Sequence, residues 1–229
     1  MKRLYLTVEG QTEAAFATGV LTPHLANFAV FLSPPRFTGL HRRRRGRIPQ
    51  GGLLNTFGHA LSDMHTWMLE DQSPDARFSM MVDLYSLPHD FPDYTIGMSK
   101  STGTEQALTL EQSLIASIGD TRFIPYLQVH EYEALVLVDP RRISTIYEIS
   151  NADLEALCQE CESYDSPEEI NHGQHSHPKF RIQARIPKYD ENVAGPLLAE
   201  AIGLQTLRER CPHFGRWLTR LEQLDAGGL

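Results

Sequence analysis

Acidic residues stand at or just after the ends of three runs of strand-forming residues, 4–8, 78–84 and 123–129. These acids are Glu9, Glu13, Asp83, Glu131 and Glu133. Ligands of open α/β sheets bind at the edge formed by the carboxyl ends of the strands. Carboxylate oxygens suit Mg²⁺ or Mn²⁺, and such ions stabilise the attacking and leaving oxygens in phosphodiester cleavage. The spacing therefore predicts a metal site, with solvated loop ends or helix N-terminal charges as the alternative.

Glu9 and Glu13 flank a turn that can bring their carboxylates to one spot. Glu9 ends the first strand, and Glu13 falls in the first turn of the helix that follows. Gly10 between them allows the backbone to turn sharply or to approach a phosphate. We expect Thr12 to cap this helix and Pro23 to end it.

The segment His130-Glu131-Tyr132-Glu133 could hold a general base, His130, beside metal ligands. If the strand continues through the segment, Glu131 and Glu133 share one face and His130 points away. If a helix begins there, the three side chains fan out. The alternative role is structural, as a polar site that braces the first strand or caps a helix.

Five arginines in one polar segment are the clearest candidates for contact with a phosphate backbone. They are Arg42, Arg43, Arg44, Arg45 and Arg47. We predict a mobile loop at residues 38–52, which could bind nucleic acid without sequence preference and more weakly as salt rises. The alternatives are a solvated loop and a contact with an acidic partner. Lys179 and Arg181 are further candidates, with a solvated helix face as the alternative.

Strands alternating with helices must position these residues. Apolar runs predict strands at residues 4–8, 28–32, 78–84 and 123–129. Helical spacing predicts a helix after Gly10 and others near residues 53–69, 104–118, 151–162, 180–186, 195–202 and 214–224. This alternation predicts an α/β fold with a mostly parallel sheet flanked by helices. We place the α/β core in residues 1–140 and a helical C-terminal extension, packed on that core, in residues 141–229.

The composition is that of a folded protein outside the membrane. The 229 residues are 41% hydrophobic and 22% charged, which excludes disordered and collagen-like chains. We expect neither a membrane span nor a signal peptide, because apolar runs are short and the N-terminal run is soon followed by charge. The first 50 residues carry a net charge of +6 in a chain of −8, so one basic end can hold phosphates. The three cysteines form no disulfide framework, and we expect a cytoplasmic location.

A zinc site is a weaker alternative for part of the chain. Cys158 and Cys161 precede His172, His175 and His177, so a set of two cysteines and two histidines is arithmetically feasible. Both cysteines, however, fall in a helical pattern in which single cysteines commonly pack against a core.

The segment Val8-Glu9-Gly10-Gln11-Thr12-Glu13 resembles the VEGxTE opening of TOPRIM-like proteins, the fold of topoisomerases, primases and overcoming-lysogenization-defect (OLD) nucleases. Further stretches resemble one uncharacterised bacterial TOPRIM-like family of unknown function, often predicted to act in phage defence. They are residues 81–88, 90–92, 118–126, 128–135, 166–171, 195–204 and 211–214. The resemblance spans Leu4 to Leu224 in the same order, and it implies a TOPRIM-like Rossmannoid fold.

The resemblance to TOPRIM nucleases also implies a Mg²⁺-dependent site. Glu9 matches the glutamate of the motif, Glu13 matches the second acid of the nuclease version, and Asp83 matches the start of the DxD motif. Tyr85 stands where that motif has its second aspartate, a departure that the resembling family shares. This argues against topoisomerase chemistry and leaves Glu131 or Glu133 to complete the metal ligands.

These observations predict a Mg²⁺- or Mn²⁺-dependent nuclease that hydrolyses phosphodiester bonds of DNA or RNA. The resemblance also implies anti-phage defence together with an ABC-type ATPase, and assembly as a homo-oligomer. The alternative is a non-catalytic subunit that binds nucleic acid or a partner, which Tyr85 favours. A small-molecule phosphotransferase or nucleotide hydrolase is a third reading, and the absence of a Gly-rich Walker loop argues against it.

Overall fold

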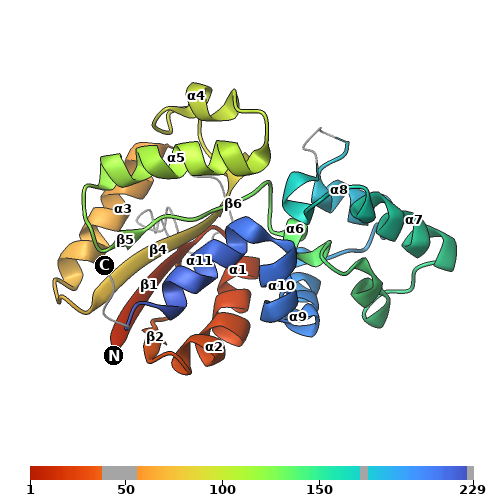
Figure 1. Cartoon of the computed structure of the whole chain (residues 1–229), viewed down its shortest axis with the longest axis horizontal. Coiled ribbons are helices and arrows are strands. Elements are labelled where there is room, and N and C mark those ends of the chain that lie inside the picture. Colours follow the sequence, from red (N-terminus) through yellow and green to blue (C-terminus); the bar gives the residue numbers. More distant parts are fainter. Residues whose placement is uncertain (38–55, 171–174, 226–229) are drawn as a thin grey trace, which may run out of the picture.

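A computed structural model describes residues 1–37, 56–170 and 175–225. Its centre is a sheet whose neighbouring strands follow the order β2-β1-β4-β5 (Figure 1). The strands are β1 (Lys2–Val8), β2 (Val30–Leu32), β3 (Arg36–Phe37), β4 (Ala76–Asp83), β5 (Phe123–Ile124) and β6 (Leu127–Gln128). All of the pairings are parallel, with β3 beside β1 and β6 beside β4. The predicted parallel sheet is confirmed.

Helices and short helical turns connect the strands and form the C-terminal part of the chain. The helices are α1 (Gln11–Phe16), α2 (Thr22–Ala26), α3 (Phe57–Glu70), α4 (Tyr94–Met98), α5 (Gly103–Ile118), α6 (Glu133–Val136), α7 (Asn151–Glu162), α8 (Pro178–Gln183), α9 (Glu191–Ile202), α10 (Leu204–Arg210) and α11 (Pro212–Glu222). A π-helical turn (Ala17–Leu21) joins α1 to α2, and 3₁₀ turns occur at Leu84–Ser86, Pro140–Thr145 and Pro167–Glu169. No helix of the described residues has the length and apolar character needed to cross a membrane.

The register of the two central strands brings their acidic ends together. Val8 of β1 pairs with Met81 of β4, so Glu9 and Asp83 both leave the sheet at the same edge. The backbone N–H of Glu9 continues this pairing by donating to the carbonyl of Met81 at 3.3 Å. Parallel strands covered on both faces are apolar along most of their length, and β4 follows this rule, with Met80 to Val82 buried.

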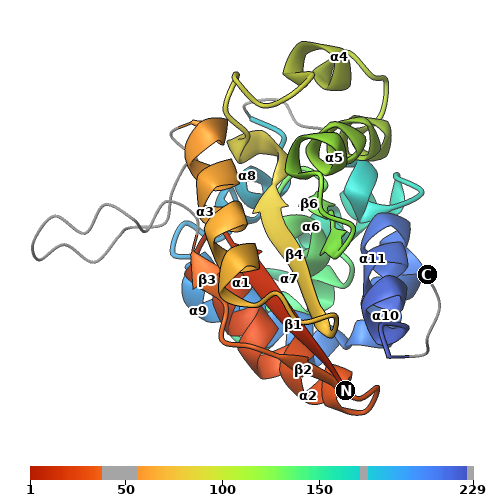
Figure 2. The same cartoon turned by 90° about the vertical axis from the view of Figure 1, so that its left-hand side faces the viewer.

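Helices cover both faces of the sheet (Figures 1 and 2). On one face, α3 and α5 form a core with Phe78, Met80 and Val82 of β4. On the other face, α1, α2 and α11 form a second core with Leu4 and Leu6 of β1. The predicted α/β class, with a mostly parallel sheet flanked by helices, is confirmed.

The C-terminal helices share the second core instead of standing apart from it. Leu157 of α7, Leu198 of α9 and Trp217 of α11 belong to the same buried cluster as β1. Helix α9 can approach α1 closely because residue 195 is glycine: a Cβ there would lie 3.0 Å from side-chain atoms of both Thr12 and Tyr132. This contact places α9 directly against the two elements that carry Glu13 and Glu133.

Two expectations for the first helix are wrong. The N-cap is Gly10, whose backbone N–H donates to the Glu13 carboxylate, while Thr12 is buried within the helix. The helix also continues past Pro23, which occupies the second position of α2. A proline fits the first turn of a helix because the N–H that it lacks is not needed there.

The strand expected at residues 123–129 is divided in two. Pro125 stands between β5 and β6 and has no N–H to donate to a neighbouring strand. Helix α10 was not predicted, because its seven residues are too few for a clear hydrophobic period.

Candidate functional site

Glu9 stands directly after β1, and two hydrogen bonds hold its side chain. Its Oε2 accepts the backbone N–H of Asp83 at 3.1 Å and the hydroxyl of Ser86 at 2.6 Å. Burial raises the pKa of Glu9, and these two hydrogen bonds act in the opposite direction. Glu9 therefore links the carboxyl end of β1 to that of β4.

Glu13 lies in the first turn of α1 and is buried. Its Oε2 accepts the backbone N–H of Gly10 at 2.8 Å. Burial raises the pKa of Glu13 to about 7, with a further contribution from the charge of Glu9. The structure thus brings the carboxylates of Glu9 and Glu13 close enough to repel each other.

Asp83 ends β4, and its Oδ1 is buried without a hydrogen-bond partner in the described part of the chain. Burial raises the pKa of Asp83 well above its usual range. The charges of Glu9, Glu13 and Glu133 raise it further. A carboxylate in this setting is stabilised by a proton or by a cation.

Glu131 and Glu133 lie close together in sequence but in different environments. Glu133, at the start of α6, is 3% exposed, and its Oε1 has no hydrogen-bond partner among the described residues. Burial raises the pKa of Glu133 to about 8, with a further contribution from Glu131. In contrast, Oε1 of Glu131 accepts the backbone N–H of Lys179 at 2.5 Å and lies 2.8 Å from Nδ1 of His177. The start of α8 therefore binds the carboxylate of Glu131. This leaves Glu133 as the acid that could share a cation with Glu13 and Asp83.

His130 packs beside Tyr85 and Gly103. It has a φ of 62°, a left-handed conformation that is uncommon for a residue other than glycine. Its ring centroid lies 5.3 Å from that of Tyr85, and a Cβ on Gly103 would come within 2.9 Å of its Nε2. Burial lowers the pKa of His130 to about 4, so the ring is neutral at physiological pH. Strand β6 ends at Gln128 and α6 begins at Glu133, so His130 and Glu131 lie in neither element.

Lys179 brings a positive charge to this edge of the sheet. It belongs to α8, and its Nζ pairs with Glu191. Its charge lowers the pKa values of Glu13 and Glu133, opposing the effect of burial. Lys179, which the sequence suggested as a nucleic-acid contact, thus lies near two of the predicted metal ligands.

Of the remaining candidates for nucleic-acid contact, the structure describes Arg181 alone. Arg181 donates from Nη1 to Glu160 at 2.9 Å and from Nε to the carbonyl of Ser176 at 2.7 Å. Its side chain is 14% exposed, so its described contacts hold α8 against α7. The other candidates, Arg42, Arg43, Arg44, Arg45 and Arg47, lie outside the described residues.

The acids of this edge fall within the match to a protein family. The model of a domain of unknown function, DUF4276, matches residues 8–222. The chain belongs to the DUF4276 family. The predicted membership of an uncharacterised family is therefore confirmed.

This DUF4276 chain is similar to a solved structure of the C-terminal region of the Burkholderia pseudomallei OLD protein. The sequence identity is 15% and the TM-score is 0.47, over 97% of this chain and 98% of the other. No curated protein matches the chain.

The acidic cluster of this DUF4276 chain has the right donor atoms for a hard cation. Its ligands are carboxylate oxygens, and Asp83 and Glu133 each have a buried oxygen without a partner within the described ranges. In residues 1–37, 56–170 and 175–225, however, no three side chains of His, Cys, Asp or Glu are grouped so as to hold a metal ion. Binding would therefore require the carboxylates to rotate toward one another.

Two tyrosines at this edge were missed in the sequence. Tyr132 and Tyr189 are buried; the hydroxyl of Tyr132 has no hydrogen-bond partner in the described part of the chain, whereas the side chain of Tyr189 interacts with Glu133. Tyr132 could have been noticed because it lies between Glu131 and Glu133. Nothing in the sequence around Tyr189 signals its position, since it follows α8 and lies 56 residues after Glu133.

The structure gives the cysteines a packing role. Cys158 and Cys161 are buried on α7, and Cys211 is buried before α11. Burial raises the pKa of Cys161 to about 12, which disfavours the thiolate that binds zinc. Of the histidines in the zinc alternative, His177 contacts Glu131 and His172 lies outside the described residues.

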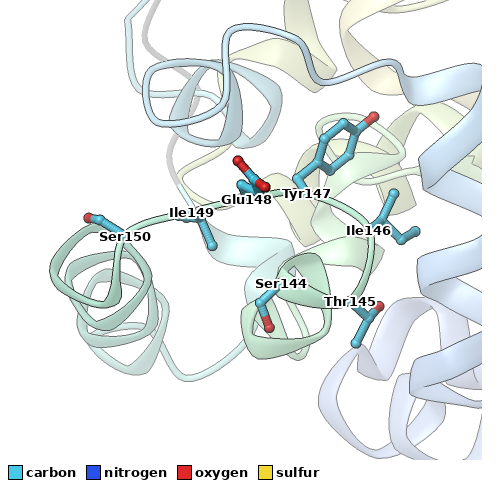
Figure 3. Close-up of a pocket in the computed structure, with 7 residues that line it drawn as sticks. All are labelled: Ser144, Thr145, Ile146, Tyr147, Glu148, Ile149 and Ser150. Carbon is cyan, nitrogen blue, oxygen red and sulfur yellow. The ribbon is translucent and has the colours of Figure 1, made fainter.

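A surface hollow of about 460 Å³ lies between the turn after α6 and the start of α7 (Figure 3). Residues 144–150 line it, so it includes none of the acids at the sheet edge. Tyr147 in its lining accepts the backbone N–H of Asp190 at 3.0 Å, and its ring lies 6.0 Å from that of Tyr189. The hollow is therefore separate from the acidic cluster.

Proposed function

We propose that this DUF4276 chain is a Mg²⁺- or Mn²⁺-dependent nuclease that hydrolyses phosphodiester bonds in DNA or RNA. The observation that carries the proposal is Oδ1 of Asp83, which is buried and unpaired in the described chain. The charges of Glu9, Glu13 and Glu133 act on the same carboxylate. Burying like charges together is costly unless a proton or a cation neutralises them. The resemblance to TOPRIM nucleases also points to three of these four acids.

Glu9, Glu13, Asp83 and Glu133 are the residues that would hold the cation. We choose Glu133 over Glu131 because α8 already binds Oε1 of Glu131. Ser86 orients Glu9, and the backbone N–H of Gly10 orients Glu13. When bound, the cation supplies charge stabilisation to the phosphate and activates the attacking water.

In the same proposal, the arginines of residues 42–47 bind the nucleic acid. Arg42, Arg43, Arg44, Arg45 and Arg47 would contact the phosphate backbone, which needs positive charge that the acidic edge cannot provide. The resemblance to the TOPRIM-like family supports a further step, in which the nuclease acts in anti-phage defence with an ABC-type ATPase.

A second candidate is a non-catalytic subunit that binds nucleic acid or a protein partner. Two observations favour it: Tyr85 replaces the second aspartate of the DxD motif, and the described carboxylates do not converge as a ready metal site. In that case the acidic edge would be a structural cation site or a remnant of one.

Cleavage assays separate the two candidates. Purified protein would be incubated with DNA and RNA substrates, including tRNA, in Mg²⁺, Mn²⁺ or EDTA. Wild type, Glu9→Ala and a control, Glu70→Ala, would be compared, because Glu70 is exposed and pairs with Arg36 instead of with a residue of the acidic cluster. The nuclease predicts cleavage that needs metal, is lost in Glu9→Ala and is retained in Glu70→Ala.

Other outcomes would reject the proposed site or favour the second candidate. Cleavage that persists in EDTA or in Glu9→Ala would show that the proposed site is wrong. Binding of nucleic acid without cleavage in any metal, with or without an added ABC-type ATPase, would favour the non-catalytic subunit.

A further inference from the structure

Strand β2 forms an edge of the sheet that is apolar and carries no charge. It lies at one end of the strand order (Figures 1 and 2), and among the described residues it pairs with β1 alone. Residues 25–35, which include β2, contain no Asp, Glu, Lys or Arg, in a chain that is 22% charged. Natural proteins commonly protect an edge strand with charged side chains, because its free N–H and C=O groups can pair with another strand. This edge lacks that protection.

The pairing with β1 determines which main-chain groups of β2 face away from the sheet. The carbonyl of Ala29 and the N–H of Ser33 both form hydrogen bonds with main-chain groups of β1, at 3.2 and 2.9 Å. Successive residues of a strand direct these groups to opposite sides, so those of Phe31 also face β1. The N–H and C=O groups of Val30 and Leu32 therefore point outward.

The side chains of β2 alternate between the core and solvent. Val30 and Leu32 are buried in the core that β1 shares with α1 and α2. Phe31 faces the opposite side of the sheet and is 49% exposed. Covering a phenylalanine that is half exposed would remove apolar surface from water and stabilise the complex that covers it.

We propose that β2 is a homodimer interface, in which it pairs antiparallel with β2 of a second copy across a two-fold axis at Phe31. In this register Val30 of each copy lies opposite Leu32 of the other, and their outward groups form four hydrogen bonds. Phe31 meets Phe31 of the second copy as a non-hydrogen-bonded pair, in which side chains approach most closely. The two sheets then become one continuous sheet, with the same surface buried on both copies.

A second copy satisfies all of the outward groups of β2. An axis at Val30 or Leu32 would form only two hydrogen bonds within β2, whereas the axis at Phe31 forms four. Extension beyond the strand is limited on both sides, because Ala29 has a left-handed φ of 55° and Pro34 has no N–H. The register at Phe31 is therefore the one that this short strand favours.

The charges around β2 also permit two copies to meet. Copies of a chain with a net charge of −8 repel each other, and contact through a segment without charges limits this repulsion. On the neighbouring strand, Lys2 pairs with Asp75 at 2.8 Å and Arg3 pairs with Asp71 at 2.9 Å. These charges are therefore already balanced within each copy.

Sedimentation velocity of the full chain at several concentrations tests the dimer. We expect wild type to sediment as a dimer, and Phe31→Glu to raise the Kd of the dimer at least tenfold, because two carboxylates would face each other at the axis. Its circular dichroism spectrum should match wild type, since Phe31 lies outside both cores. Ile96→Glu is the matched control and should remain dimeric, because Ile96 is 56% exposed on α4, at the other end of the molecule from β2 (Figures 1 and 2).

Disulfide cross-linking tests the register. Phe31→Cys places two thiols in a non-hydrogen-bonded pair, whose Cα atoms lie about 4.5 Å apart, within the range of a disulfide. The three native cysteines are buried, so we expect mild oxidation to link Phe31→Cys into a dimer that a reductant separates. Phe28→Cys is the control and should remain largely unlinked, because Phe28 is 39% exposed but precedes the turn at Ala29, away from the axis.

Three outcomes would overturn the proposal. Wild type that sediments as a monomer at every concentration would reject the dimer. A dimer that persists in Phe31→Glu would have its interface elsewhere on the surface. Equal cross-linking of Phe31→Cys and Phe28→Cys would indicate apolar association without strand pairing. None of these measurements depends on metal or on cleavage, so their failure is distinct from that of the proposed nuclease.

Discussion

Acids at the two edges of the sheet have pKa values that are shifted in opposite directions. At the amino ends of the strands, each acid has a basic partner: Lys2 with Asp75 at 2.8 Å, Arg3 with Asp71 at 2.9 Å, and Arg122 with Asp120 at 2.7 Å. Hydrogen bonds lower the pKa values of these three aspartates. At the carboxyl ends, the pKa values of Glu9, Glu13, Asp83 and Glu133 are all raised.

The difference shows which edge is arranged for stability and which is not. Ion pairs at the amino edge neutralise acids that are only partly buried, where such pairs contribute modest energy and cost less desolvation than fully buried pairs. At the carboxyl edge the acids are buried with one another, and Lys179 is the base whose charge acts on Glu13 and Glu133. Buried acids with strongly raised pKa values occur at functional sites more often than elsewhere. Changes at the two edges should therefore affect different properties.

The largest effect is expected from Asp83→Asn. The amide keeps the shape but lacks the negative charge that favours a cation, so the proposed nuclease activity should fall about 100-fold or more. The free energy of unfolding in EDTA should stay equal or rise, because burial and the neighbouring acids disfavour the carboxylate that is replaced. Cleavage rates and chemical denaturation would be measured side by side.

Asp75→Asn is the control for Asp83→Asn, since Asp75 directly precedes the other end of the same strand. It should leave cleavage unchanged. Equal losses of activity in the two variants would contradict the division of the sheet into two edges with different tasks.

The second effect is a loss of stability as pH rises from 6.5 to 8 without metal. Glu13, with a pKa of about 7, and Glu133, with a pKa of about 8, bind protons in the folded chain that the unfolded chain has already released. Raised carboxylate pKa values favour folding at low pH and lose this contribution as pH rises through them, by about 2 kcal/mol in total here. His130, with a folded pKa of about 4, offsets only about 0.4 kcal/mol of this loss, because the unfolded imidazole still releases protons at the start of the window.

Urea denaturation at several pH values in EDTA would measure this slope. Glu133→Gln should flatten it, and Mn²⁺ should restore stability most at pH 8, where the ligands are already deprotonated. A stability that stays constant or rises between pH 6.5 and 8 in EDTA would contradict the placement of these carboxylates.

The third effect is a loss of stability expected from a substitution at the amino edge of the sheet. Arg122→Ala removes the ion pair with Asp120 and two donations, to the carbonyls of Asp71 at 2.6 Å and Met68 at 3.2 Å. We expect a loss of about 1–2 kcal/mol in the free energy of unfolding. Cleavage and the Kd for Mn²⁺ should be unchanged at a temperature where the variant is folded. A matching loss of metal affinity would mean that the two edges are coupled.

The smallest effect is expected from Arg44→Gln. Losing one phosphate contact should reduce the slope of log K against log salt by about 0.7–0.9 for nucleic-acid binding, without changing the Kd for Mn²⁺. Fluorescence anisotropy with labelled DNA and RNA at several salt concentrations measures the slope. An unchanged slope would remove Arg44 from the proposed contact.

Residue patterns predicted much of the fold and part of the candidate site. Strands with buried apolar runs, such as residues 78–84, and long amphipathic helices, such as residues 104–118, are local features that neighbouring residues specify. The predicted helix and strand boundaries were wrong at two prolines. Pro23 follows a π-helical turn and does not end the helix, and Pro125 divides an expected strand. These exceptions depend on packing that a hydrophobic period does not record.

The environment of each acid could not be predicted in the same way. The alternation of Glu131 and Glu133 left both as candidates, and only α8, which begins 47 residues after Glu131, distinguishes them. His130 has a left-handed backbone conformation, and its ring lies beside Gly103 and Tyr85. Such contacts join segments far apart in the chain.

The sequence by itself determined that Glu9, Glu13 and Asp83 would meet at one edge, because parallel strands in an α/β sheet end on the same side. Only the tertiary structure decided which acids are buried without partners, which one α8 binds, and where Tyr132, Lys179 and Tyr189 lie. The physical reason is that strand direction follows from local patterns, whereas burial and charge environment depend on every segment that packs around a residue.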